Sequence, residues 1–382
     1  MGPVPPEEAS RTAVQSIWTF PSVLASAFVV AWGAEAAQFS ISQGLALALL
    51  AWIQVLPEFA VEAVISWHRD VPLMTANFTG ALRLLTGLGW PMIWVVHAFA
   101  QRHRGGRAPW PAVKLEEEHA VEVVSLVPPL LYFAWITYKG TLDCWDAALL
   151  LAMYAAYLVV LNRLPPKDEE TAHDVAAVPR AVLRLPPTQR TLSIVGLFLL
   201  GGLGIYVTVH PFLDSMIGLA TLLGISQFVF VQWVAPFLSE FPEFVSTSNW
   251  ARSRGKAGMA LMNMVSSNVN QWTVLAAMIP IVYSASLGHP ATVPLHEHRV
   301  ELMLTVLQGL LGVILLGNFD FKAHEAVGLF VLWAVQFAVP HWREEISIVY
   351  ALWLMLEIGS VTWRPDRLKA FVVFPKLWRR HR

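Results

Sequence analysis

Two glutamates inside apolar stretches, Glu58 and Glu243, each directly follow a proline, Pro57 and Pro242. A carboxylate in the middle of a membrane costs several kcal/mol unless it is paired, hydrated or protonated. A proline inside a helix leaves the carbonyl one turn earlier without its donor. Each Pro-Glu pair therefore offers side-chain and backbone oxygens at one depth, the ligands that Ca²⁺ and Na⁺ prefer. The pattern predicts a cation site; the alternative is a kinked helix whose glutamate bonds to a neighbour.

Neutral polar residues follow each Pro-Glu pair at matching distances. Asn77 lies 19 residues after Glu58, and Asn263 lies 20 residues after Glu243. From Asn263, Ser267 and then Asn270 or Gln271 recur at i+4 and i+7 or i+8, which places them on one face of a helix. Amide and hydroxyl oxygens on that face would complete a cation shell without adding charge.

The amino-acid composition indicates whether water or lipid surrounds the protein. Of 382 residues, 56% are hydrophobic and 14% charged, against about 25% charged in soluble domains. Net charge is −1, and the single cysteine, Cys144, cannot form an internal disulfide. These values exclude a soluble enzyme, a disordered chain and a nucleic-acid-binding domain, and they predict a protein that spans a lipid bilayer.

Apolar blocks long enough to cross a bilayer define the predicted elements. We expect an all-α polytopic membrane protein with about eleven transmembrane helices, the block at 216–248 beginning with a short interfacial piece at 216–224. The predicted helices are residues 18–37, 42–66, 71–98, 119–138, 143–162, 191–210, 216–248, 256–283, 300–317, 323–339 and 345–361.

Most lysines and arginines fall on one side of the membrane when the N-terminus is placed outside. Twenty then lie on inward segments and five on outward ones, with Arg83 inside a helix. This bias predicts a cytoplasmic C-terminus. Size and the absence of a targeting segment favour a cell inner membrane.

The two halves of the chain repeat their polar residues. Ser42-Gln43 precedes Pro57-Glu58 much as Ser226-Gln227 precedes Pro242-Glu243. Five helices per half put the second copy in the opposite sense, an inverted repeat of the kind that builds secondary transporters with a midplane site. The predicted organisation is a first five-helix repeat at 1–162, a cytoplasmic linker at 163–190, a second inverted repeat at 191–340, and an extra helix with a basic tail at 341–382.

With these motifs in view, the chain resembles the sodium/calcium exchanger (cation/calcium antiporter) family. Both inverted repeats of that family carry a Thr-Ser-x-Pro-Glu helix followed by a Gly-Asn-x-x-Gly-Ser-Asn helix. The resemblance covers most of the chain. It implies cation exchange at a central site formed by the second, third, seventh and eighth helices, with the first and sixth helices sliding to expose it alternately.

The match is uneven between the halves. In the first, Glu58, Asn77 and Gly80 match, but Gln54-Val55 replaces Thr-Ser, Ala81 replaces the ligand serine and Leu85 replaces the next polar residue. The second half reads Ser239-Glu240 in place of Thr-Ser and keeps nearly the whole remaining pattern. The cation ligands that the motifs and the resemblance together imply are Glu58, Glu243, Asn77, Ser239, Glu240, Asn263, Ser267 and Gln271.

Arg83 is the residue that complicates this assignment, because it lies in the third helix beyond Asn77. It either extends to the inner surface or pairs with a site carboxylate, Glu58 or Glu62, as a charge partner in the site. Pairing would remove one negative charge, which Glu240 would restore. Glu62, one turn after Glu58, either extends an ion path or, as we expect, ends near the interface.

The predicted function is secondary active cation antiport by alternating access, with Ca²⁺, Na⁺ or H⁺ as the transported ions. One alternative is a Na⁺/H⁺ or other cation/proton antiporter that does not carry Ca²⁺; another is a scaffold or regulator that has lost transport. No catalytic motif points to an enzyme. The predicted partners are inorganic cations and the lipid bilayer, with no cofactor and no nucleic acid; the oligomeric state is left open.

Overall fold

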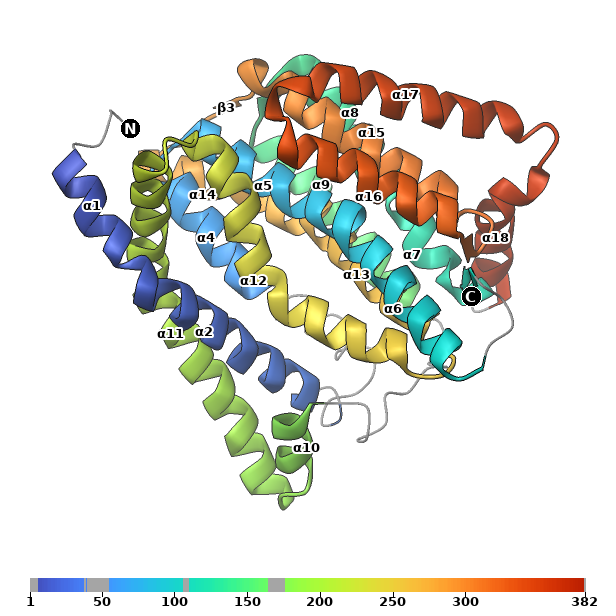
Figure 1. The fold of residues 1–382 in the computed structure, drawn as a ribbon, viewed down its shortest axis with the longest axis horizontal. Helices are drawn as coiled ribbons and strands as arrows, with labels where there is room; N and C mark the ends of the chain where they lie inside the picture. The colour runs from blue at the N-terminus through green and yellow to red at the C-terminus, as the bar shows by residue number, and fades with distance from the viewer. Residues whose placement is uncertain (1–5, 38, 40–54, 106–109, 164–175, 381–382) are drawn as a thin grey trace. The chain divides into compact units, whose positions relative to one another are not determined.

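A computed structural model describes residues 6–37, 39, 55–105, 110–163 and 176–380 of the chain. Helices dominate these residues (Figure 1). The Ser42-Gln43 motif, Gln54, the first part of the predicted 42–66 helix and residues 164–175 of the predicted linker lie outside the described residues.

The chain forms two compact units, and each draws on both halves of the sequence. Unit 1 comprises Met1–Ala81, Pro166–Ser246 and Met278–Ala291; unit 2 comprises Leu82–Pro165, Thr247–Ala277 and Thr292–Arg382. These units therefore divide the chain differently from the sequence repeats at 1–162 and 191–340.

Unit 1 is built from helices alone among its described residues. Two of them, α5 and α12, continue into unit 2, and α14 enters from it. Its helices are α1 (Pro6–Val14), α2 (Ser16–Ala37), α4 (Leu56–Trp67), α5 (Val71–Leu84), α10 (Ala177–Leu183), α11 (Pro187–Leu222), α12 (Gln227–Arg252) and α14 (Ala276–Leu287).

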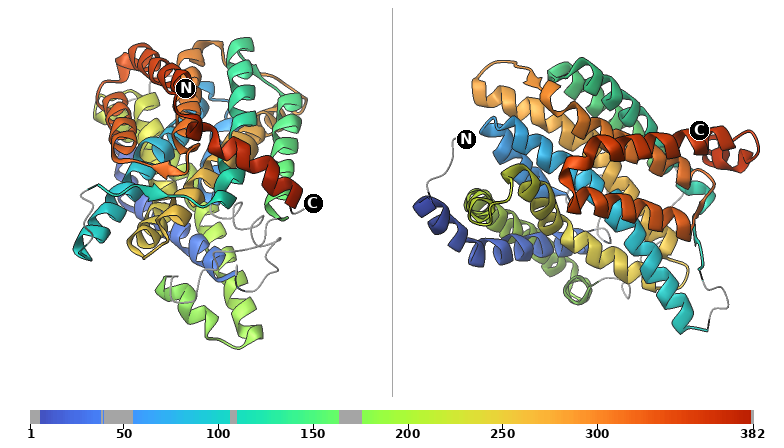
Figure 2. Two further views of the ribbon diagram at one scale, coloured as in Figure 1. Left: turned by 90° about the vertical axis from the view of Figure 1, so that its right-hand side faces the viewer. Right: turned by 45° about the horizontal axis from the view of Figure 1, so that its top comes forward.

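The packing of unit 1 centres on α2 against α11, which run side by side in Figures 1 and 2. A Cβ at Gly201 would come within 2.6 Å of Val30 Cγ2, and one at Gly204 within 2.3 Å of Ser26 Oγ. Small residues at such a seam let two membrane helices approach closely. Glu35 of α2 accepts a hydrogen bond of 2.8 Å from Ser246 Oγ of α12, which ties this pair to α12.

Unit 2 contains helices, two π-helical turns (η1 and η3) and four two-residue strands. Its elements are η1 (Leu85–Gly89), α6 (Trp90–His103), β1 (Val113–Lys114), η2 (Glu117–His119), α7 (Ala120–Ser125), α8 (Val127–Lys139), β2 (Thr141–Leu142), α9 (Cys144–Leu161), α13 (Ala257–Asn270), η3 (Gln271–Leu275), β3 (Val293–Pro294), η4 (His296–His298), α15 (Arg299–Leu316), β4 (Asp320–Phe321), α16 (Ala323–Ala338), η5 (Pro340–Trp342), α17 (Arg343–Ser360), η6 (Pro365–Leu368) and α18 (Lys369–Arg380).

The strands of unit 2 pair between the two halves of the sequence. β1 pairs antiparallel with β4, so that Val113 faces Phe321, and β2 pairs with β3, so that Leu142 faces Val293. β3 and β4 follow β1 and β2 at distances of 180 and 179 residues. Each strand therefore pairs with the other half's strand that does not correspond to it in sequence: β1 corresponds to β3 but pairs with β4, and β2 corresponds to β4 but pairs with β3.

Matching caps begin α9 and α16, 179 residues apart. Asp146 Oδ2 accepts from the backbone N–H of Asp143 at 2.8 Å, and Glu325 Oε2 accepts from that of Lys322 at 2.8 Å. Each carboxylate also holds a cation: Lys139 Nζ lies 2.6 Å from Asp146, and Arg367 Nη1 lies 2.7 Å from Glu325. Carboxylates in a first helical turn satisfy backbone donors that the helix leaves open.

Six helical segments among the described residues are long and apolar enough to cross a membrane. A seventh results if the bent pair Pro340–Ser360 and Pro365–Arg379, which meet at 106°, counts as one span (Figure 2). The six are Glu7–Ala37, Val71–His103, Glu117–Lys139, Cys144–Leu161, Pro187–Leu222 and His296–Leu316. The chain is therefore an all-α, multi-pass membrane protein.

One predicted helix boundary is wrong, and the predicted linker contains a helix. The piece at 216–224 is not a separate interfacial helix, because α11 runs without interruption from Pro187 to Leu222 with Pro211 inside it. The predicted linker at 163–190 also contains helix α10, whose Val182 packs with Ile194 and Ala37 in the core of unit 1. Proline costs a membrane helix one hydrogen bond but does not force it to end.

Candidate functional site

Glu58 and Glu62 lie one turn apart on α4 in unit 1. Glu58 falls in the first turn, directly after Pro57, and its exposed fraction is 1%; that of Glu62 is 0%. Proline suits a helix start because its missing donor would have no helical partner there. Glu62, which the sequence analysis expected near the interface, is buried among other helices as fully as Glu58.

Asn77 of α5 meets Glu62 rather than standing alone. Its Nδ2 donates a hydrogen bond of 2.7 Å to Glu62 Oε2. The remaining oxygens, Asn77 Oδ1 and Glu62 Oε1, are buried and have no hydrogen-bond partner among the described residues. Buried polar oxygens are normally bonded, so this pair presents two oxygens of the kind that a hard cation takes. Glu62 is a candidate ligand that the sequence spacing of i+4 from Glu58 could have indicated.

The third group of unit 1 lies on α12. Ser239, Glu240 and Glu243 are all buried there, between or beyond the two prolines of the helix, Pro236 and Pro242. Ser239 Oγ donates to the carbonyl oxygen of Pro236 at 3.2 Å. Three acceptor side chains thus occupy little more than one turn of a continuous helix that contains two prolines.

A close contact at Gly80 joins α5 to α12. A Cβ on Gly80 would lie 1.9 Å from the carbonyl oxygen of Gln232, so only glycine permits this approach. Pro236 has no N–H, and the carbonyl of Gln232 therefore lacks its helical donor. Gln232 Nε2 also donates to Thr79 Oγ1 at 3.2 Å. Gly80 therefore lets α5 pack closely against α12 at Gln232.

The remaining predicted ligands, Asn263, Ser267 and Gln271, belong to unit 2. They lie on α13 and at the first residue of η3; Ser267 and Gln271 are buried and Asn263 is half-buried. Asn268, their neighbour, serves structure instead: its Nδ2 donates to the carbonyl of Leu82 at 3.4 Å. A π-turn at η3 displaces backbone carbonyls from the regular helical pattern, and such turns occur frequently at functional sites.

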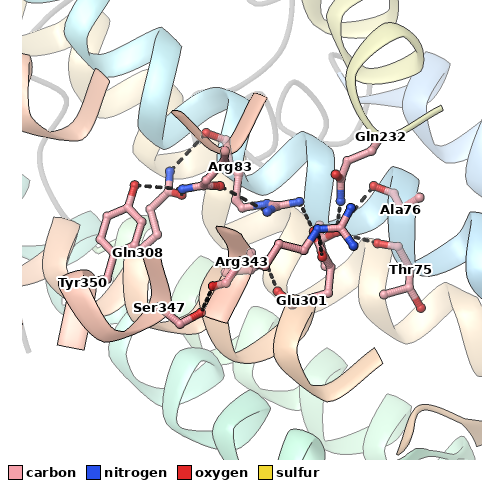
Figure 3. Close-up of polar contacts among 12 residues, drawn as sticks. Thr75, Ala76, Arg83, Gln232, Glu301, Gln308, Arg343, Ser347 and Tyr350 are labelled. Carbon is pink, nitrogen blue, oxygen red and sulfur yellow. Dashed lines mark hydrogen bonds and ion pairs between the residues drawn. The ribbon is translucent and has the colours of Figure 1, made fainter. Parts of the chain in front are cut away.

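Arg83 has a partner that the sequence did not suggest. Its exposed fraction is 1%, so it does not extend to the surface. Arg83 Nη2 is hydrogen-bonded to Glu301 of α15 (Figure 3). Nη1 of Arg83 donates to Gln336 at 3.1 Å. Arg343 of α17 approaches the second oxygen of Glu301 at 2.9 Å. The carboxylate that holds Arg83 is therefore Glu301, where the sequence analysis offered Glu58 or Glu62.

Among the described residues, no group of three or more His, Cys, Asp or Glu side chains is placed to hold a metal ion. Amide and hydroxyl oxygens are present on α5, α12 and α13 beside the predicted carboxylates.

The sequence profile of the family described as sodium/calcium exchanger protein matches the chain twice, over residues 13–162 and again over residues 193–340. Together the two matches cover well over half of the chain. It belongs to the sodium/calcium exchanger family. Each match contains one Pro-Glu pair and the polar helix that follows it, so the family relation extends to both halves of the candidate site.

Solved structures of sodium/calcium exchanger relatives agree with this assignment. The crystal structure of an H⁺/Ca²⁺ exchanger, CAX, is 30% identical, with 96% of this chain and 91% of that chain covered and a TM-score of 0.86. The sodium-calcium exchanger NCX_Mj, soaked with 100 mM Na⁺ and 10 mM Sr²⁺, is 18% identical, with 88% and 99% covered and a TM-score of 0.55, which supports the fold. No curated protein matches the sequence.

Proposed function

We propose that this chain is a secondary active antiporter that exchanges Ca²⁺ for H⁺ across a cell inner membrane. The observation that carries the proposal is the similarity to the H⁺/Ca²⁺ exchanger CAX over 96% of the chain at 30% identity. The buried oxygens of Glu62 and Asn77 support it, because they suit a hard cation. Carboxylates that alternate between a cation and protons would couple the two flows without a cofactor and without catalysis.

The proposed architecture is the eleven-helix layout with two inverted five-helix repeats, an extra C-terminal helix, an outside N-terminus and a cytoplasmic C-terminus. Two features support the repeat. The family profile matches each half of the chain. Strands β1 and β2 of the first half pair with strands β4 and β3 of the second half. Alternating access follows from such a repeat, since each half can adopt the conformation of the other.

Within this mechanism Glu58 and Glu243 hold the cation, supplemented by Asn77, Ser239, Glu240, Asn263, Ser267 and Gln271. We add Glu62 to this set because it is buried and bonded to Asn77. A Na⁺/H⁺ antiporter is the second candidate, favoured by the loss of the first-half ligand serine at Ala81. The pairing of Arg83 with Glu301 argues against a scaffold whose site Arg83 would plug.

The test is ion flux in proteoliposomes that contain the full chain. An imposed proton gradient should drive radioactive Ca²⁺ uptake, and Glu243→Gln should reduce it to the level of empty liposomes because the cation loses a charged ligand. Glu345→Gln, which changes an exposed carboxylate of α17, is the matched control and should transport normally. Proton-driven Na⁺ uptake without Ca²⁺ uptake would select the second candidate, and normal uptake by Glu243→Gln would refute the site.

A further inference from the structure

The C-terminal helix of unit 2, α18, lies nearly at right angles to the helix before it. The segments Pro340–Ser360 and Pro365–Arg379, which contain α17 and most of α18, meet at 106°. α17 packs along α15, and the two run side by side in Figure 1. α15 is part of a segment long and apolar enough to cross a membrane. A helix nearly perpendicular to such neighbours runs close to the plane of the bilayer surface.

Buried contacts fix the start of α18 beside the end of α15. The backbone N–H of Ala370 donates to the carbonyl oxygen of Gly317, the residue that ends α15, at 2.8 Å. Arg367, whose exposed fraction is 2%, lies 2.7 Å from Glu325 of α16 and 2.9 Å from Glu357 of α17. α18 is therefore held where a membrane-crossing helix ends, at the depth of the lipid headgroups.

The side chains of α18 divide into three faces, because successive residues of a helix turn by about 100°. The buried face packs against α7 and η2 and consists of Ala370, Val373 and Leu377. The aromatic face is half-buried and consists of Phe371, Phe374 and Trp378. The basic face is exposed and consists of Lys369, Lys376 and Arg379, with Val372 between them. By this geometry the aromatic and basic faces lie on nearly opposite sides of the helix.

This arrangement suits a helix that lies in the membrane interface beside the rest of unit 2. A helix with aromatic side chains on one side and lysine or arginine on the other lies with the first side toward the acyl chains and the second toward the headgroups. Trp363, between α17 and α18, is 85% exposed, and tryptophan is enriched at the level of the headgroups. The buried face leaves both other faces of α18 available to lipid.

The charge of α18 is positive and has little compensation from the protein. The sequence of α18 contains no acidic residue. Lys369 lies 3.7 Å from Glu117 of η2, but both side chains are exposed, and such pairs contribute little. Arg163, which follows α9, adds a further cation, with its guanidinium carbon 4.6 Å from the ring centre of Trp378. The phosphates of anionic lipids are negative groups that a helix in the interface meets.

We propose that α18 lies in the membrane interface and that its basic face binds the headgroups of anionic phospholipids. A lysine or arginine near an anionic membrane surface strengthens the association by about fivefold, the equivalent of ~1 kcal/mol. Because Ala370 and Arg367 fasten α18 to the helices of unit 2, lipids bound there contact the folded protein rather than a detached tail.

The experiment measures which lipid lies at α18 in the full chain. Cys144 is the only cysteine, so Cys144→Ser with Val372→Cys places one bimane fluorophore on the basic face. The labelled protein is reconstituted in phosphatidylcholine vesicles that contain increasing fractions of doxyl-labelled phosphatidylglycerol or doxyl-labelled phosphatidylcholine. Quenching of the bimane by each lipid gives their relative affinities at this position, and we expect phosphatidylglycerol to quench at the lower mole fraction.

Two charge variants and one position control make the comparison specific. Lys376→Gln with Arg379→Gln should reduce the preference for phosphatidylglycerol by at least about fivefold. Lys376→Arg with Arg379→Lys keeps the charge and should keep the preference. Bimane on Val349→Cys, an exposed valine of α17, should show a weaker preference that the variants of α18 do not change.

Equal quenching by the two lipids, or a preference that Lys376→Gln with Arg379→Gln retains, overturns the headgroup site. Absence of quenching by either lipid would show that α18 lies outside the interface. Inorganic phosphate added at constant ionic strength should leave the preference unchanged, and its loss would assign the basic face to soluble anions instead. None of these measurements involves ion flux, so the result does not depend on the proposed antiport.

Discussion

Helices α5 and α13 occupy corresponding places in the two halves of the sequence, but they differ in the polar side chains that they carry. Each has fourteen residues and continues into a five-residue π-turn. An offset of 186 residues aligns Asn77 with Asn263 and Ala81 with Ser267, but also Arg83 with the buried apolar Val269. One helix is fastened by a buried charge, whereas the other presents neutral oxygens.

This contrast indicates how a duplicated transporter divides its tasks. Arg83 fastens α5 to α15 through Glu301, and Gly80 brings α5 against α12. No residue of α13 is charged, and its polar side chains are serines and amides. The first half therefore has an anchoring charge on this helix, where the second half has the neutral side chains that we propose as ligands.

The largest expected effect comes from removing the charge that fastens α5. Arg83→Leu leaves Glu301 buried with only Arg343, and breaking a buried pair costs about 3–5 kcal/mol of unfolding free energy. The matched change in α13, Val269→Ala, truncates a core side chain and should cost about 0.5–3 kcal/mol. Denaturant unfolding in detergent measures both.

The double variant Arg83→Leu, Glu301→Leu tests whether the charge is the cause. It should recover part of the loss, because two apolar side chains leave no stranded charge. A double variant less stable than Arg83→Leu would contradict the pairing.

Substitutions at the matching positions 80 and 266 should lower the free energy of unfolding by smaller amounts. Gly80→Ala forces a methyl group onto the carbonyl of Gln232 and should cost about 1–3 kcal/mol. Ser266→Ala removes one hydrogen bond to Tyr157 and should cost about 0.5–1.5 kcal/mol. The same unfolding measurement ranks them, and an equal cost for both would show that α5 and α12 do not approach as described.

The smallest effect concerns the ligands themselves, at positions 81 and 267. Ala81→Ser restores the hydroxyl of the family pattern, whereas Ser267→Ala removes one. We expect Ca²⁺ affinity to rise in the first and fall in the second by about fivefold, roughly the 1 kcal/mol of one polar contact. Isothermal titration of the solubilised protein measures both changes. Shifts in the same direction would mean that the two positions are not equivalent.

The sequence predicted those features that depend on local composition. The ends of α2, α9 and α15 lie within about two residues of the predicted blocks, because the length of an apolar run is set by bilayer thickness. The Pro-Glu pairs and the polar face of α13 were visible for the same reason: polar residues inside apolar runs stand out. The family relation that they suggested is confirmed.

Features that depend on distant contacts were not predictable. The partner of Arg83 lies 218 residues away on α15, and nothing near Arg83 in the sequence points to it. The burial of Glu62 depends on the neighbouring helices rather than on α4. The separation predicted between the blocks at 191–210 and 216–224 is absent, because α11 is one continuous helix. Residue types thus indicated the kind of chemistry, while pairing partners needed the fold.

The crosswise strand pairing has a consequence for how the protein is made. β1 and β2 leave the ribosome early, yet their partners β4 and β3 come from residues 320–321 and 293–294. Until those residues are synthesised, the first half holds open backbone donors and acceptors that only the second half can satisfy. A polypeptide released after residue 162 would therefore be a poor independent folding unit, and both copies must be inserted before either one matures.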